Sequence, residues 1–205
     1  MTASAAPAAA TGLPGFNTPA VGFEQPFAML EACHERVQRT LALLQRLREH
    51  VAAPGAGGSA GADVGAGAAD EPARQAARDV LRYFDVAAPL HHQDEELHVF
   101  PRLLAQGPAE VVALVLSLQQ DHVLMAGDWA AARRPLLALA EGRQARFSLA
   151  DAAILDRFAG RYARHIAGEE SIAYPAALAL VPPQDLAAMG AEMASRRGAR
   201  GPLRG

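Results

Sequence analysis

Hydrophobic residues recur every three or four positions along four stretches of the chain, and this spacing predicts amphipathic helices. The four stretches are 23–51, 70–105, 109–140 and 149–181. A Gly/Ala-rich linker at 52–69 and turn-forming residues at 106–108 and 141–148 separate them. Strand signals are absent, because β-branched and aromatic residues are few and no stretch alternates with a period of two. The pattern predicts an all-α protein, an antiparallel up-down-up-down four-helix bundle.

The ends of the chain have a different composition from the helical stretches. Residues 1–22 are rich in Ala, Pro, Gly and Thr, which predicts a disordered N-terminal tail. Residues 182–205 are basic and contain several glycines, and we expect a solvated C-terminal tail there. The 205-residue chain is therefore expected to hold one domain at 23–181, with a flexible linker at 52–69.

Ionisable residues occupy positions that the helical spacing assigns to the core. Burying one charge without a partner costs several kcal/mol or more, so these residues must compensate one another or bind something. Carboxylates and imidazoles together suit iron, manganese or zinc, and two carboxylates are able to hold two cations. The sequence therefore predicts a dinuclear metal site inside the bundle. Its candidate ligands are His34, His91, Glu95, His122, His165 and Glu169.

A repeated motif supports this prediction. The segments "HHQDEELHVFP" (91–101) and "HIAGEESIAYP" (165–175) share His, both Glu and Pro, and Phe100 corresponds to Tyr174. Residues four apart lie on one face of a helix, so the first His and first Glu of each copy point inward together.

The same comparison assigns the neighbouring ionisable residues of the first copy. His92 aligns with Ile166 and lies about 100° around the helix from His91, so we expect it to face away from the site. Asp94 and Glu96, like Glu170 in the second copy, are expected on the solvated face. His98 lies close to the inward-facing positions of the helix. The sequence does not decide whether it binds a metal or supports a ligand.

The motifs resemble the hemerythrin-like family, also called the HHE cation-binding family. They comprise two HxxxE pairs, each followed by an aromatic residue and Pro, and single histidines in "EACHERV" and "QQDHVLM". The resemblance covers roughly residues 23–180 and implies a four-helix bundle around a non-haem di-iron centre. It implies that Glu95 and Glu169 bridge the irons. The four matching histidines, His34, His91, His122 and His165, would then be terminal ligands.

The sequence departs from the oxygen-carrying members of that family. Those have an HxxxH pair on the third helix, where this chain has Ala126 four residues after His122. They also have an Asp five residues after the fourth-helix His, where this chain has Glu170. A shell of four His and two Glu is more similar to members linked to iron–sulfur repair and nitric oxide chemistry. Those members carry an N-terminal Cys-bearing domain, whereas the first 26 residues here contain no Cys.

The net charge and the cysteine content limit the classes of binding partner and indicate the cellular compartment. A net charge of −3 gives no general attraction to nucleic acid or to an anionic membrane. The one cysteine, Cys33, cannot form an internal disulfide and suits the cytoplasm. No signal peptide or 18-residue apolar stretch is recognisable.

The expected function is binding of, or reaction with, a small diatomic ligand or peroxide at two iron ions. The alternatives are a non-catalytic iron or redox sensor and a structural bundle with bound zinc. A ferritin-like site is disfavoured, because that architecture needs Glu on two helices and ExxH on the other two. The third stretch has no inward Glu, and the fourth has no ExxH.

Overall fold

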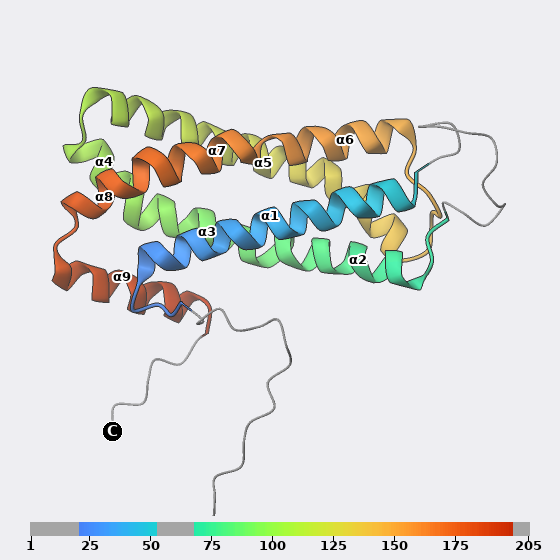
Figure 1. The fold of residues 1–205 in the computed structure, drawn as a ribbon, viewed down its shortest axis with the longest axis horizontal. Helices are drawn as coiled ribbons and strands as arrows, with labels where there is room; N and C mark the ends of the chain where they lie inside the picture. The colour runs from blue at the N-terminus through green and yellow to red at the C-terminus, as the bar shows by residue number, and fades with distance from the viewer. Residues whose placement is uncertain (1–20, 53–67, 199–205) are drawn as a thin grey trace, which may run out of the picture.

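The computed structural model describes residues 21–52 and 68–198. Four long helical segments run side by side along the molecule (Figure 1). The first is α1 (Pro26–His50) and the third is α5 (Ala109–Ala140). These segments confirm the predicted all-α bundle, and the described residues contain no β-strand.

The second and fourth segments are built from shorter helices joined by π-helical turns and, at one place in the fourth segment, by a break at Arg161. The second consists of α2 (Glu71–Arg82), η1 (Tyr83–Ala87), α3 (Ala88–Asp94), η2 (Glu95–Val99) and α4 (Phe100–Gln106). The fourth consists of α6 (Leu149–Gly160), α7 (Tyr162–Gly168), η3 (Glu169–Ala173) and α8 (Tyr174–Leu180). Ser148 and Asp151 form a capping box at the start of α6.

Each π turn lies immediately before a proline-containing turn. A proline has no N–H to donate, and its ring clashes with the carbonyl four residues back in a regular α-helix. The preceding residue instead donates to the carbonyl five residues back, which is the wider π-helical pattern. These bonds run from Ala88 to Tyr83, from Phe100 to Glu95 and from Tyr174 to Glu169, just before Pro89, Pro101 and Pro175.

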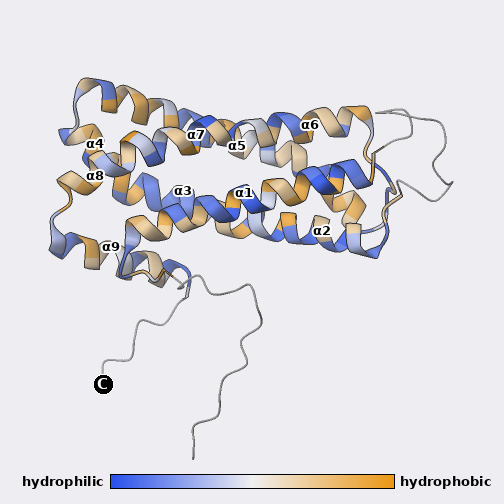
Figure 2. Cartoon of the chain, in the orientation of Figure 1, coloured by the Kyte–Doolittle hydropathy of each residue, from blue (hydrophilic) through white to orange (hydrophobic). Residues whose placement is uncertain are grey.

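The interior consists of two apolar clusters with a polar layer between them. One cluster includes Val37, Phe84 and Phe158, and the other includes Leu30, Phe100 and Val115. The layer between them carries buried histidines and carboxylates. In Figure 2 the ribbon at α3 is hydrophilic, although it lies midway along the bundle.

A fifth helical segment, α9 (Pro183–Arg196), corrects the expectation of a solvated tail from residue 182. It lies beside the start of α1 at one end of the bundle (Figure 1). Its Met189 and Met193 side chains are buried in the apolar cluster there. Gly190 permits the close approach, because a Cβ at this position would lie 1.8 Å from the Phe23 carbonyl oxygen.

Parts of the predicted tails and linker lie outside the described residues, namely 1–20, 53–67 and 199–205. Within the described part of the chain, no helix combines the length and the apolar character needed to cross a membrane.

Candidate metal centre

The structure brings all six predicted ligand residues together in the polar layer. They come from α1, α3, η2, α5, α7 and η3, so each of the four long segments contributes. No side chain among them is more than 8% exposed, and both glutamates are at 0%. These residues are His34, His91, Glu95, His122, His165 and Glu169.

Four of these residues form one compact group, which we call position A. Position A comprises His34, His91, Glu95 and Glu169, and one possible ligand atom of each lies within 4.8 Å of the others. The Nε2 atom of His34 lies 3.1 Å from Glu169 Oε2 and 3.9 Å from Glu95 Oε1. The Nε2 atom of His91 lies 3.4 Å from the same Glu95 oxygen. The imidazoles therefore turn Nε2 toward the carboxylates.

A second compact group, position B, comprises His92, His122 and His165. The remaining carboxylate oxygens face this side. The Nε2 atom of His122 lies 3.4 Å from Glu95 Oε2, and that of His165 lies 3.0 Å from Glu169 Oε1. Each glutamate therefore presents one oxygen to position A and the other to position B, as a carboxylate that bridges two cations would.

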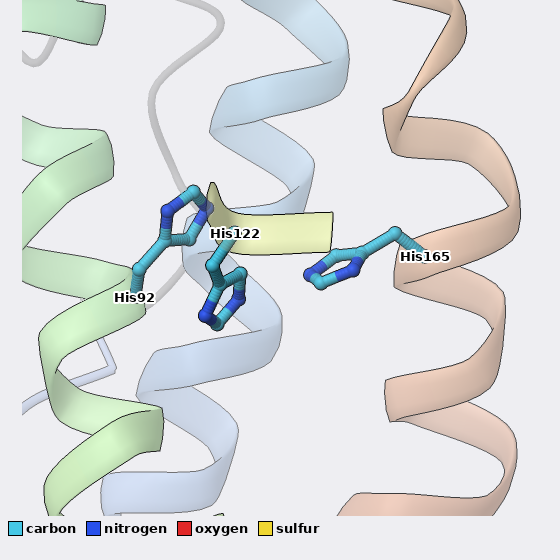
Figure 3. A group of neighbouring side chains, drawn as sticks. All are labelled: His92, His122 and His165. Atoms are coloured by element: carbon cyan, nitrogen blue, oxygen red, sulfur yellow. The ribbon is translucent and has the colours of Figure 1, made fainter. Parts of the chain in front are cut away.

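His92 corrects the sequence prediction, which turned it away from the site. Its ring stacks on His122 with centroids 4.1 Å apart, and Figure 3 shows the rings of His92, His122 and His165 gathered between the helices. The reason is that α3 has two neighbours at this level. His91 packs beside His34 of α1, with ring centroids 4.7 Å apart, while His92, about 100° further round, faces α5.

The Nδ1 atoms of three histidines face carboxylates outside the two positions. Glu170 lies 2.9 Å from His34 Nδ1, and Glu96 lies 2.9 Å from His122 Nδ1. Asp121 lies 3.5 Å from Nδ1 of His165. The two contacts at 2.9 Å are hydrogen bonds, and such partners fix which ring nitrogen is free to bind a metal and hold the ring in place.

Glu96 and Glu170 were predicted to be merely solvated, and both are partly exposed. The sequence signal for their role is the second Glu of each motif copy, which the repeat retains at the same place.

Asp94 and His98 lie outside the two positions. Asp94, predicted to be solvated, is instead fully buried and accepts hydrogen bonds from Arg196 and Arg197 at the end of α9. The sequence left open whether His98 binds a metal or supports a ligand. In the structure its side chain pairs with Glu192 of α9 at 2.6 Å. Both side chains fix α9 to the second segment.

Buried polar atoms in the layer are left without hydrogen-bond partners. They are Nδ1 of His91, Nε2 of His122, both ring nitrogens of His165, Oε2 of Glu95 and both carboxylate oxygens of Glu169. Unpaired buried polar atoms are rare and costly in native proteins. Most of these atoms face positions A and B, and nitrogen and oxygen donors suit divalent transition metals. The residues present therefore fit a pair of bound cations.

The electrostatics of the layer divide the two carboxylates. Burial, together with the nearby charge of Glu169, raises the pKa of Glu95 to about 7. Burial also acts to raise the pKa of Glu169, but the imidazoles of His165 and His34 close to its carboxylate outweigh this effect and lower that pKa. The layer thus favours one ionised carboxylate strongly and a second only weakly.

Burial likewise lowers the pKa values of two histidines. The pKa of His91 falls well below its usual value because of burial and the neighbouring His34. Burial, with His122 and His165 nearby, lowers the pKa of His92 to about 3. Both imidazoles are therefore neutral near pH 7, which is the form that binds metals.

Comparison with known proteins agrees with this donor set. Residues 25–177 match the family model described as the hemerythrin HHE cation binding domain. The chain belongs to this family. It is also 31% identical over 176 residues to an uncharacterized protein of Haemophilus influenzae, an alignment that covers 85% of this chain and 91% of that protein.

Replacing His92 with alanine tests the corrected position of this residue. Position B then retains His122 and His165 but loses its third imidazole, so we expect affinity for one of two metal ions to fall by about 10- to 100-fold or more. Metal content after dialysis at fixed free metal measures this. The exposed neighbour Gln93, changed to alanine, is the matched control. Unchanged metal content in the His92 variant would show that this imidazole is not a ligand.

Proposed function

We propose that this protein binds two iron ions at positions A and B and that a small diatomic ligand or peroxide binds or reacts there. The observation that carries the proposal is the pair of buried glutamates, each with one oxygen toward each group of histidines. Membership of a cation-binding family supports it.

The residues divide between the two positions. His34 and His91 would hold the ion at A, and His122 and His165, joined by His92, would hold the ion at B. Glu95 and Glu169 would bridge. The thiol of Cys33 is buried in the neighbouring apolar cluster and belongs to neither group, so the donor set contains no sulfur. Nitrogen and carboxylate donors without thiolate favour iron, manganese or zinc over copper(I).

A bound iron pair would supply the redox chemistry and the coordination of a small ligand. The chain's own contribution is to keep the layer dry and its donors in place. The apolar clusters on either side of the layer exclude bulk water. Glu96 and Glu170 hold the His122 and His34 rings through Nδ1, which leaves their Nε2 atoms directed at the carboxylates.

Metal analysis of the aerobically purified full chain tests the proposal. We expect about two iron ions per chain and an absorption spectrum that changes when the protein is reduced or exposed to nitric oxide. One zinc ion per chain and no visible or near-ultraviolet band would contradict it and favour a structural metal site.

A sensory role is the second candidate, and the position of α9 favours it. Asp94 precedes the bridging residue Glu95 in the chain, and its carboxylate is held by two arginines at the end of α9. A change at Glu95 on metal loading or oxidation would therefore reach α9 through one peptide bond. Consumption of oxygen or peroxide by the reduced protein would favour catalysis over sensing.

A cytoplasmic location is part of the proposed function, since a lone thiol suits a reducing compartment.

A further inference from the structure

The hydroxyl of Tyr174 lies inside the polar layer, beside position A. Tyr174 is the first residue of α8 and is 2% exposed. Its hydroxyl donates a hydrogen bond to Glu95 Oε1 and lies 3.2 Å from Nε2 of His34. Both of these atoms belong to position A, so the phenol group touches the atoms that would hold the first metal ion.

The equivalent residue in the other motif copy has no hydroxyl. Phe100 begins α4 just as Tyr174 begins α8, and each follows a π turn that starts at a bridging glutamate. The Phe100 ring stacks on His122 and the Tyr174 ring stacks on His34, with ring centroids 5.5 Å apart in both cases. Because the ring positions correspond, a single oxygen atom distinguishes the two copies at this point.

Positions A and B also differ in the number of donors. Both share the two carboxylates, but A has two imidazoles, His34 and His91, while B has three. An ion at A would thus have one protein donor fewer than an ion at B, which leaves more room there for an incoming ligand. The hydroxyl lies at the position with fewer protein donors.

We propose that the Tyr174 hydroxyl is a hydrogen-bond donor to a small anionic or oxygen ligand at position A. This inference rests on the proposed metal pair and adds to it a residue that recognises the bound ligand. The hydroxyl can donate one hydrogen bond, and in the absence of a ligand it donates this bond to Glu95. An incoming ligand with a partial negative charge accepts that hydrogen bond in place of the carboxylate.

Azide titration of the oxidised, iron-loaded full chain tests the assignment. Azide is a small anion whose binding to ferric iron is followed by a charge-transfer absorption band. Tyr174→Phe keeps the ring and removes only the hydroxyl. We expect it to bind the same amount of iron as the wild type but to bind azide about tenfold more weakly, a difference of about 1.4 kcal/mol. The azide band should shift in heavy water in the wild type and not in the variant.

Tyr162→Phe is the matched control, because Tyr162 is also a buried tyrosine of the fourth segment. Its ring packs against Phe84 and Phe158 in the other apolar cluster. This variant should bind azide as the wild type does.

Three results would overturn the inference. Equal azide affinity in Tyr174→Phe and wild type would show that the hydroxyl makes no contact with the ligand. Loss of iron from Tyr174→Phe would make the hydroxyl a support for the metal site instead. A phenolate-to-iron band in the wild type that disappears in the variant would make it a metal ligand. Absence of iron from the wild type would count against the proposed metal pair itself, so the two failures are distinguishable.

Discussion

Replacing Glu169 with alanine is expected to abolish binding of both metal ions. One of its oxygens lies 3.1 Å from His34 Nε2 and the other lies 3.0 Å from His165 Nε2, so this single carboxylate reaches both positions. Its loss removes one carboxylate donor from each position, which leaves three donors at A and four at B. Metal content per chain should fall from two to well below one.

Thermal unfolding with and without metal gives a second measure of the same change. A ligand at a thousand times its dissociation constant stabilises the folded state by about 4 kcal/mol. The wild type should gain stability of this order on metal loading, whereas Glu169→Ala should gain almost none. Glu169→Gln, which keeps the side-chain volume, separates the loss of a ligand from the creation of a cavity.

Glu35→Ala is the control for this experiment, because Glu35 lies on α1 with its side chain 65% exposed. It should retain both metal ions and the full stabilisation. A Glu169→Ala protein that still binds two ions would exclude Glu169 as a bridging ligand.

Removing both arginines that hold Asp94 is expected to destabilise the protein strongly. Asp94 is 0% exposed, and its carboxylate bonds to Arg196 and Arg197. A buried carboxylate that loses its partners costs about 3–5 kcal/mol. Arg196→Ala with Arg197→Ala should therefore lower the free energy of unfolding in urea by about 3 kcal/mol. Release of α9 would limit the loss, since water would then reach Asp94.

A third substitution distinguishes the unpaired charge from the loss of arginine packing. Adding Asp94→Asn to the double variant removes the buried charge and should restore part of the stability, which is a coupling between the sites. Arg39→Ala is the control, because its pairing with Glu35 is exposed and worth little. A double variant that unfolds at the wild-type urea concentration would show that the arginines do not stabilise the fold.

The inward residues of the layer were predictable because their spacing is regular. His91 with Glu95, and His165 with Glu169, lie four apart, and the repeat fixes both pairs at once. His92 was not predictable in this way. The helical spacing of hydrophobic residues assigns only one face of each helix to the interior. In the structure, two faces of α3 are directed inward, because His91 packs against α1 and His92 packs against α5.

The last helix, α9, was not predicted because of the amino-acid composition of this part of the chain. Between residues 182 and 205 the sequence is rich in glycine and arginine, and these residues indicate a solvated segment when read alone. The structure shows that two of those arginines have a buried partner, Asp94, about a hundred residues earlier in the chain. Pairing between residues so far apart in the chain leaves no local sequence pattern. The burial of Asp94 and the packing of α9 could therefore be recognised only in the three-dimensional structure.

The proline-linked π turns have a consequence for metal affinity. Glu95 and Glu169 each begin such a turn, and each turn is followed within a few residues by a proline. Because the prolines lack the N–H that a regular α-helix needs at these places, we expect Glu95 and Glu169 to be positioned in the same way with and without a metal ion. The centre is in this sense preorganised. The entropy cost of ordering its donors is met when the chain folds, and the interaction with incoming cations is correspondingly stronger.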